Sequence, residues 1–335
     1  MYWTGAELQG LGNPYLTWQK TDEFNFGVEF GLWKGRMKGE FNVYTKKTSN
    51  LLSNMDLPHS NGFASYVDNV GEVKNNGWEA SASVYVIRNA ERDINWIIGG
   101  QLTYNKNYVS KLSEAIKAQN EAYLKEDVDV ANLFYEGRPQ NGIYVVRSLG
   151  IDPANGQEIF LDKDGNRMDI WKASDKVYVG QADPRYRGIA NTMFMWKGLT
   201  VNVSASFYWG GKRYNSTIIG RVEVGRTTLM AQNVDARALY DRWQKPGDIV
   251  PFRKYDDSST RATSRFVMDD KVFEIQSVGL QYKWDSAWVK KYMRATSVTF
   301  GVNMSDLWHF STIKMERGTS YPFARNIQGS IKFLF

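Results

Sequence analysis

Few residues in this chain could carry covalent chemistry. Its 335 residues include no cysteine, which excludes disulfides, thiolate zinc sites and cysteine nucleophiles. The two histidines, His59 and His309, are far apart and fall in segments that we expect to be long loops. Either could act as a base or a metal ligand, but we favour a solvated loop histidine in both cases. The chain also lacks the nucleophile elbow, the P-loop, the zinc-protease motif and a complete dinucleotide fingerprint. We therefore predict that it is not an enzyme and holds no cofactor.

One short segment carries enough carboxylates to suggest a calcium loop. The sequence DKDGNRMD places three aspartates and an asparagine around a glycine: Asp162, Asp164, Asn166 and Asp169. A loop of the EF-hand type requires a bidentate glutamate at its twelfth position, where this chain has Ala173. Because Asp-Gly-Asn is also ordinary hairpin-turn chemistry, we favour a plain turn and keep calcium binding as the alternative.

Two other expected loops contain aromatic residues close to arginines. Such groups could stack on sugar rings or hold a peptide, although packing against neighbouring loops or a partner protein is the simpler interpretation. The candidate contact residues are Phe134, Tyr135, Arg138 and Tyr144 in one loop, and Arg213, Tyr214 and Trp243 in the other.

The charge balance does not point to a polyanionic partner. The chain has 42 basic and 36 acidic residues, a net charge of +6, which is too small a bias to indicate nucleic-acid binding. Its one compact basic cluster, WVKKYMR at 288–294, lies in an expected short turn. Nucleic-acid binding would require basic and aromatic residues along one groove, so we interpret this cluster as a solvated turn near lipid headgroups.

The elements that must position these residues are long strands. Apolar and polar residues alternate with period two in nine segments, and several segments reach about 15 residues, well beyond the usual 5–6. The phase of the alternation changes between Ile275 and Leu280, which predicts a β-bulge. The expected strands lie near 24–32, 37–43, 78–86, 94–104, 186–196, 199–209, 266–284, 297–304 and 326–335.

Short and long connections alternate strictly between these strands. The short ones lie near 33–35, 88–93, 197–198 and 285–293, and the long ones near 50–70, 110–185, 210–264 and 305–325. Two loop stretches, 113–124 and 229–243, have helix-like composition. An all-β, antiparallel up-and-down meander with all its long loops at one end is typical of a transmembrane β-barrel in the outer membrane, with long extracellular loops. A soluble β-sandwich is the alternative.

Aromatic residues are placed as such a barrel requires. Tryptophans fall near the expected strand ends, where interfacial girdles form: Trp33, Trp96, Trp196, Trp209 and Trp284. The last strand, NIQGSIKFLF, alternates up to Phe335, and it resembles the terminal strand that outer-membrane proteins present to their assembly machinery.

A series of motifs makes the resemblance more specific. Asn13-Pro14, Trp18 and Lys20-Thr21 precede one strand, and Tyr44 with Thr48 closes the next. Further along come NVGEVKNNGWE at 69–79, DRWQKPGDIVPF at 241–252, RFVMDDKVFEIQSVGLQYKW at 265–284 and YPFARNIQGSIKFLF at 321–335. In this order they resemble the C-terminal portion of SusC/RagA-like TonB-dependent transporters.

The resemblance implies a function and partners. Such transporters are 22-stranded barrels with a plugged lumen, so nine strands, spanning residues 1–335, would be the C-terminal part of the barrel, and the plug and the N-terminal strands have no counterpart here. The complete protein would import an oligosaccharide or a peptide across the outer membrane. Its partners would be a SusD-like surface lipoprotein, outer-membrane lipid and, through the plug, TonB. A soluble, secreted glycan-binding module and a passive porin-like channel are the alternatives.

Overall fold

Nine antiparallel strands form one sheet whose order follows the chain. In the computed structural model, residues 10–57, 62–63, 65–129, 133–231, 233–256, 258–313 and 325–335 are described. Each strand pairs with its neighbours in sequence, apart from one insertion between β4 and β9. The nine predicted strands are therefore confirmed. Their bounds are β1 (Lys20–Leu32), β2 (Met37–Asp56), β3 (Ser65–Asn89), β4 (Ile94–Leu112), β9 (Tyr186–Trp196), β10 (Leu199–Tyr214), β11 (Val267–Trp284), β12 (Ser297–Ser311) and β13 (Asn326–Leu334).

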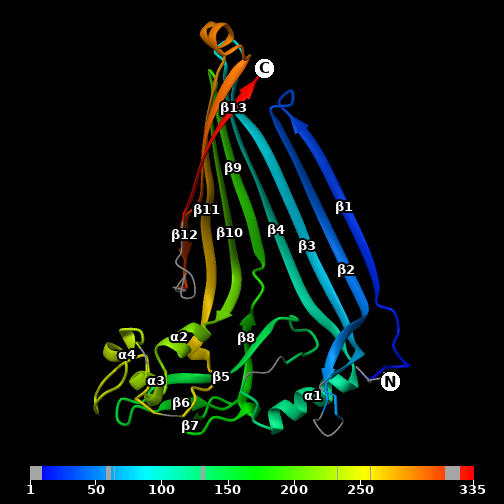
Figure 1. The fold of residues 1–335 in the computed structure, drawn as a ribbon. Helices are drawn as coiled ribbons and strands as arrows, with labels where there is room; N and C mark the ends of the chain where they lie inside the picture. The colour runs from blue at the N-terminus through cyan, green and yellow to red at the C-terminus, as the bar shows by residue number, and fades with distance from the viewer. Residues whose placement is uncertain are drawn as a thin grey trace, which may run out of the picture.

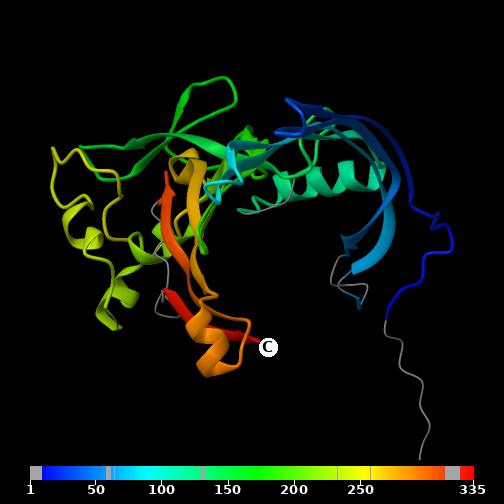
Figure 2. The ribbon, with the colours of Figure 1, turned by 90° about the horizontal axis from the view of Figure 1, so that it is seen from above.

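The sheet is strongly curved. Viewed along the strands, it forms an open arc that runs from β1 to β13 around a hollow centre (Figure 2). Over the part of the chain that the structure describes, the convex side carries large exposed apolar side chains, such as Phe24 and Phe26, which are 68% and 61% exposed. A soluble sandwich would bury these groups under a second sheet, so that alternative is wrong.

The convex side, called the outer face here, is apolar and aromatic. Because side chains alternate along each strand, residues in register on neighbouring strands share a face. Val43, Trp78, Tyr104, Tyr186 and Trp209 are in register across β2, β3, β4, β9 and β10. The rings of the last four form a continuous row, with centroid separations of 6.1, 5.0 and 5.1 Å. This row is an aromatic girdle, to which Trp209 alone of the predicted tryptophans contributes; Trp33, Trp96, Trp196 and Trp284 lie at the short-loop end of the strands.

The concave side, called the inner face here, is polar. The residues one position along, Asn42, Glu79, Thr103, Arg187 and Tyr208, are also in register across the same five strands. The alternation therefore separates the sheet into an apolar outer face and a polar inner face, as a barrel wall requires.

Tight turns close the short-loop end of the sheet, which is the upper end in Figure 1. Trp33, Lys34 and Gly35 all have positive φ, of 53°, 55° and 78°, between β1 and β2. Between β9 and β10, Gly198 has φ of 84°, and a Cβ atom there would lie 2.6 Å from the carbonyl oxygen of Lys283. Only glycine fits that position without strain.

The predicted bulge in β11 is confirmed. The pairing of β11 with β12 shifts register between Ile275 and Ser277, inside the segment where the alternation changes phase. β11 also shifts against β10 in the same region, between Ser204 and Ala205 on the β10 side. An extra residue there bends the strand and keeps both halves apolar on the outer face.

The predicted loop at 50–70 is largely wrong. β2 continues to Asp56 and β3 begins at Ser65, so this hairpin extends well past the girdle. The extension is stabilised because Met55, Val70 and Val73 pack against Ile116 of helix α1 (Glu114–Lys125). α1 confirms the predicted helix at 113–124, and Ser113 caps its N-terminus by accepting a hydrogen bond from the Ile116 amide.

The long loops fold into a layer of their own at the lower end of the strands (Figure 1). This loop layer, residues 113–185 and 215–266, contains a four-stranded sheet in the order β7-β6-β5-β8, which the sequence does not predict. No helix in the described part of the chain is long and apolar enough to cross a membrane. Besides α1, the layer contains β5 (Gly142–Ile151), β6 (Glu158–Leu161), β7 (Arg167–Met168), η2 (Ala173–Asp175), β8 (Lys176–Gln181), α2 (Ser216–Arg221), α3 (Arg226–Ala231), α4 (Arg237–Tyr240) and η3 (Ser264–Phe266).

The division of the sheet into two faces predicts unequal effects of a buried charge. Val203 lies on the outer face of β10 about midway between the short turn and Trp209, in register with Thr192 and Val278, and Asn202 lies on the inner face. We expect Val203→Lys to lower the free energy of unfolding in a bilayer by about 2–4 kcal/mol, because the ammonium group would enter hydrocarbon. Urea titration in lipid vesicles measures this, with Asn202→Lys as the matched control; equal losses would contradict the assignment of the faces.

Candidate functional site

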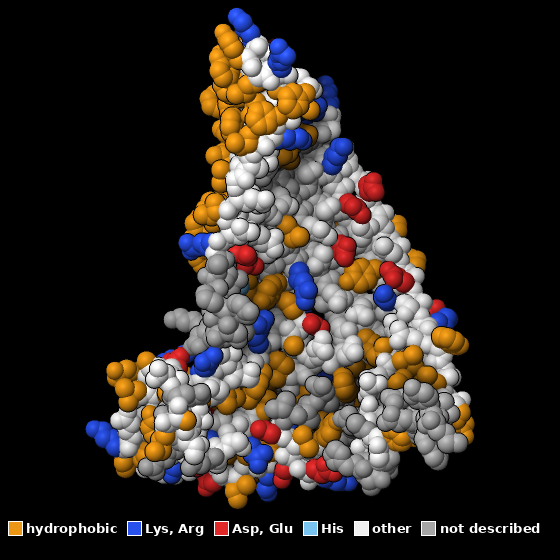
Figure 3. Space-filling model, viewed as in Figure 1, with side chains coloured by type: hydrophobic (Ala, Val, Ile, Leu, Met, Phe, Trp, Pro, Cys, Tyr) orange, Lys and Arg blue, Asp and Glu red, His pale blue; other side chains and the backbone are white. Residues whose placement is uncertain are grey.

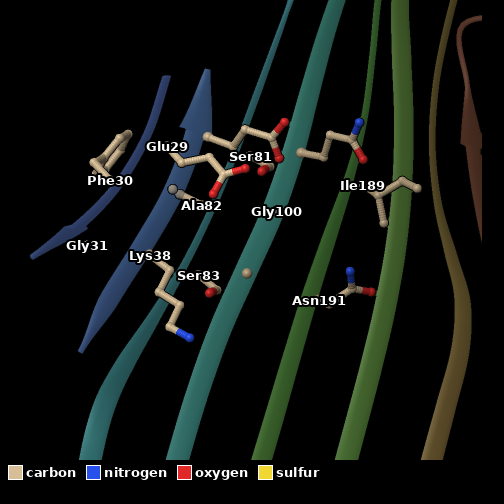
Figure 4. Close-up of a pocket in the computed structure, with 14 residues that line it drawn as sticks. Glu29, Phe30, Gly31, Lys38, Ser81, Ala82, Ser83, Gly100, Ile189 and Asn191 are labelled. Carbon is tan, nitrogen blue, oxygen red and sulfur yellow. The ribbon is translucent and has the colours of Figure 1, made fainter. Parts of the chain in front are cut away.

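A large hollow lies on the inner face, nearer the short-loop end of the wall than the loop layer. It has a volume of about 830 Å³ and is open to the concave side. Figure 4 shows Glu29, Lys38, Ser83 and Asn191 projecting from β1, β2, β3 and β9 around it. Glu29 is paired in register with Glu40, so this part of the wall carries two carboxylates near one ammonium group. Its lining of carboxylates, hydroxyls and carboxamides offers hydrogen bonds to a polar molecule in transit.

A second cavity lies where the wall meets the loop layer. It has a volume of about 570 Å³, and its lining includes Asp183, Arg187, Tyr208, Arg213 and Asp270. Nε and Nη2 of Arg213 lie 3.0 and 2.8 Å from Oδ2 of Asp270, whose side chain is 8% exposed. The Tyr208 hydroxyl lies 3.5 Å from the other carboxylate oxygen. This ion pair fixes one rim of the cavity.

Arg187 is the residue in this cavity that is best placed to meet a ligand. It is exposed, projects from β9 on the inner face, and lies in register between Thr103 and Tyr208. Within the described ranges, no hydrogen bond or ion pair is found for its guanidinium group. An exposed guanidinium can bind a carboxylate, a phosphate or the hydroxyl groups of a sugar.

Three of the candidate loop residues come together in an aromatic cluster. Tyr144 lies between Tyr135 and Tyr178, with ring centroids 5.0 and 5.7 Å away, and the Arg138 guanidinium lies 4.7 Å from the Tyr178 ring. Burial raises the pKa of Tyr144, and its hydroxyl has no hydrogen-bond partner among the described residues. Sequence reasoning missed Tyr178, because only the pairing of β5 with β8 places it beside Tyr144.

Three other candidates pack inside the loop layer or against its helix. Phe134 is half-buried against the α1 cluster, and its backbone amide and carbonyl bind the Asn120 carboxamide. Tyr214 packs edge-on against Phe266, with ring centroids 6.2 Å apart. The Trp243 indole donates a 2.9 Å hydrogen bond to the Pro153 carbonyl. The predicted loop placement of Arg213 and Tyr214 is wrong, because β10 continues to Tyr214 with the support of its pairing to β11.

Arg242, next to Trp243 in the resemblance motif, holds the loop layer together. It is 1% exposed, and its guanidinium donates hydrogen bonds of 2.8–3.2 Å to the carbonyls of Val222, Val224, Arg253 and Lys254. The same group stacks 4.2 Å from the ring centroid of Tyr255. One side chain thereby satisfies four backbone acceptors from two segments, which explains an arginine in a buried position.

A second arginine joins three segments of the layer. Nη2 of Arg265 lies 2.8 Å from Oε2 of Glu158 and 3.0 Å from Oε2 of Glu223, and both carboxylates are almost fully buried. Thr263 donates a 2.7 Å hydrogen bond to Glu158. Burial alone would raise the pKa of Glu223, but hydrogen bonds and positive charge from Arg265 hold it below its usual value. Glu223 is therefore ionised at neutral pH.

The turn at 162–169 has the geometry of an Asx turn. Oδ1 of Asp162 accepts hydrogen bonds from the amides of Asp164 and Asn166, and Oδ2 accepts one from the Asn166 side chain. Asp169 turns toward Arg167 instead. Both carboxylate oxygens of Asp162 are thus engaged by the turn, and the described residues contain no group of three or more acidic, histidine or cysteine side chains arranged for a metal ion.

The predicted loop placement of His309 is wrong. It lies in β12, in register with Glu274, and its Nδ1 is 3.5 Å from a Glu274 carboxylate oxygen. The strand continues to Ser311 because β11 supplies paired residues up to Val272. His59 lies outside the described residues.

Comparison with known proteins matches this geometry. The family described as "TonB dependent receptor-like, beta-barrel" matches residues 4–240. TonB-dependent receptor P26 of Formosa agariphila is 28% identical over 98% of this chain and 34% of its own length. TonB-dependent receptor SusC of Bacteroides thetaiotaomicron is 22% identical, over 94% of this chain and 29% of its own length.

Solved structures share the fold. The RagAB peptide importer in its "open-open" state superposes with a TM-score of 0.78 at 21% identity, over 97% of this chain and 36% of that chain. The RagAB peptide transporter gives a TM-score of 0.77 over 92% of this chain and 34% of that chain. The present chain spans about a third of the length of the curated relatives that it matches.

A curved wall with an aromatic outer face, a polar inner face and long loops at one end is part of an outer-membrane β-barrel. This chain belongs to the TonB-dependent receptor-like β-barrel family, and it is SusC/RagA-like. The family consists of TonB-dependent receptors and is not enzymatic.

Removing the buried guanidinium should loosen the loop layer. Arg242→Met would leave four buried carbonyls without donors, and we expect a loss of about 3 kcal/mol or more in the stability of this layer. Hydrogen exchange of the amides in 216–231 and 252–255 measures it. Lys245→Met, an exposed change three residues away, is the matched control, and unchanged exchange in Arg242→Met would contradict the role given to Arg242.

The Glu223–Arg265 pair should make the loop layer sensitive to acid. A carboxyl whose pKa is lowered by folding stabilises the fold above its unfolded value of 4.5, and that contribution is lost as pH falls through the lower folded pKa. We expect Glu223→Gln to speed hydrogen exchange in the loop layer at neutral pH. Below about pH 4.5, the further increase in the exchange rate should be smaller in this variant than in the unmodified protein. Glu121→Gln, on the exposed side of α1, should change neither quantity. An acid response as steep as in the unmodified protein would contradict this.

Proposed function

We propose that this chain supplies barrel wall and loop layer to an outer-membrane importer that takes up an oligosaccharide or a peptide. The observation that carries the proposal is the charged cavity at the junction of the inner face with the loop layer, where Arg187 lies exposed beside the Arg213–Asp270 pair. A solute that enters between the loops would meet these groups first and the polar wall next.

The proposal includes the partners that the resemblance implies. A SusD-like surface lipoprotein would cover the long-loop end, and TonB would drive transport through a plug domain. The solved relatives are complexes named RagAB, and their peptide cargo is a property of those proteins. For this chain, the polar lining and the tyrosine cluster of Tyr135, Tyr144 and Tyr178 are compatible with sugar rings and with peptide side chains alike.

Uptake by cells that express the complete transporter tests the proposal. The probes are a tryptic digest of casein and a mixture of oligosaccharides from partly hydrolysed polysaccharides, each followed by mass spectrometry of the depleted medium. We expect one of the two mixtures to be depleted selectively, and depletion to cease when TonB is deleted. Depletion that persists without TonB would instead support a passive channel and overturn active import.

Arg187 should contribute directly to uptake. We expect Arg187→Ala to lower the rate at limiting substrate by about tenfold, because one charge-assisted hydrogen bond of about 1.5 kcal/mol would be lost. Arg221→Ala removes an exposed arginine at the end of α2, away from the residues that line the cavity, and is the matched control. Equal uptake by the two variants would show that Arg187 does not contact the solute. The comparison requires the same amount of folded protein in the membrane for both variants.

A further inference from the structure

The turn between β11 and β12 is more than a hairpin connection. Residues 285–296 contain a short helical segment, η4 (Val289–Met293), where the sequence predicts a short turn. It stands at the short-loop end of the sheet, next to the end of β13 (Figure 1). In an outer-membrane barrel this end faces the periplasm.

The helical segment packs on the outer face of the sheet. Val289 is fully buried in a small cluster with Ala295, Val298 and Trp284. Trp284 and Val298 are in register, and Val298 is also in register with Phe333 of β13. These residues belong to the apolar alternation of their strands, so η4 folds back over the side that meets lipid and away from the inner face. Figure 2 shows the segment beside β13, outside the arc of the sheet.

The surface of this segment is aromatic and basic. Trp288, Tyr292 and Met293 are 48%, 64% and 37% exposed. Trp284 and Trp288 stack with ring centroids 5.2 Å apart and an interplanar angle of 11°, and Tyr292 continues the stack 5.5 Å from Trp288. Lys291 lies 5.3 Å from the Tyr292 ring centroid. The space-filling view shows an apolar patch at the upper end of the molecule, with basic side chains at its tip (Figure 3).

The charge of the η4 segment and its position on the sheet indicate what kind of molecule contacts it. Residues 283–294 contain four basic residues and one acidic residue, namely Lys283, Lys290, Lys291, Arg294 and Asp285. The neighbouring turn between β9 and β10 repeats the arrangement, with Lys197 5.7 Å from the ring centroid of Trp196. Aromatic rings at the edge of an apolar face, followed by cations, match the boundary between acyl chains and phosphate groups.

We propose that the η4 segment is a membrane foot, which inserts Trp288 and Tyr292 among the headgroups of the inner leaflet and binds the phosphate of an anionic phospholipid through Lys290 and Lys291. The aromatic rings continue the lipid-facing surface of the sheet, and Lys290 and Lys291 lie exposed in the same helical turn. This role is separate from solute transport, and it does not depend on which solute is carried.

Spin labels can locate the foot, because the chain contains no cysteine. Tyr292→Cys and Glu91→Cys, the latter in the turn between β3 and β4, are each labelled with a nitroxide in the complete transporter, freed of any other cysteine. The protein is reconstituted in vesicles of phosphatidylethanolamine and phosphatidylglycerol. We expect the label at 292 to be relaxed more by oxygen, which concentrates in lipid, and the label at 91 more by a water-soluble nickel chelate. Nickel accessibility at 292 equal to that at 91 would overturn the proposal.

Lipid binding tests the charge. We expect Lys290→Gln with Lys291→Gln to weaken binding of fluorescent phosphatidylglycerol to the detergent-solubilised transporter by about 25-fold, since each basic residue near an anionic surface is worth about fivefold. Lys290→Arg with Lys291→Arg should retain binding. Lys163→Gln with Lys172→Gln, exposed in the loop layer, is the matched control. Unchanged affinity in the variant with Lys290→Gln and Lys291→Gln would overturn the proposal. It would also be overturned if the spin label at 292 became protected from the nickel chelate only after periplasmic proteins were added.

Discussion

Backbone hydrogen bonding in lipid is the constraint on which this structure depends. Hydrocarbon offers no partner for an unpaired amide, so each strand that crosses it must pair along its whole length. The seven inner strands satisfy this by pairing on both sides, whereas β1 and β13, at the ends of the arc, each pair on one side only. Curvature turns one side of the resulting sheet toward lipid and the other toward water. The faces of the side chains, the position of the aromatic girdle and the polar lining of the cavities all follow from that arrangement.

The loop layer is stabilised in a different way. Its apolar clusters are small, and buried charged groups connect them. Arg242 satisfies four backbone carbonyls, and Arg265 holds two carboxylates from segments far apart in the chain. A buried ion pair that loses one partner is strongly destabilised, so these contacts favour a single arrangement of the loops over many loosely packed ones. Such an arrangement holds the loop layer in one position relative to Arg187 and the Arg213–Asp270 pair, which lie on the wall.

The sequence predicts the sheet far better than the layer. Alternation identifies the nine strands and the bulge near Ser277, because lipid on one face and water on the other make period two strict. It fails beyond the girdle, where β2 and β3 continue under the cover of α1. The layer depends on contacts such as Glu158 with Arg265, 107 residues apart, which no local pattern reveals. Likewise, Arg213 could be identified from the sequence because it lies next to an aromatic residue, Tyr214. Arg187 could have been identified only by looking for charged residues at the inner-face positions of β9.

The length of β3 has a consequence for how the protein meets its surroundings. With 25 residues it is more than twice as long as the 9–11 residues that a strand needs to cross a bilayer. At about 3.3 Å per residue, and allowing for tilt, β3 rises on the order of 30 Å above the lipid surface. The wall therefore has a raised rim on the side of β2, β3 and β4, which have 20, 25 and 19 residues against 11 in β9. Molecules that approach through a coat of surface polysaccharide reach this rim before they reach the membrane.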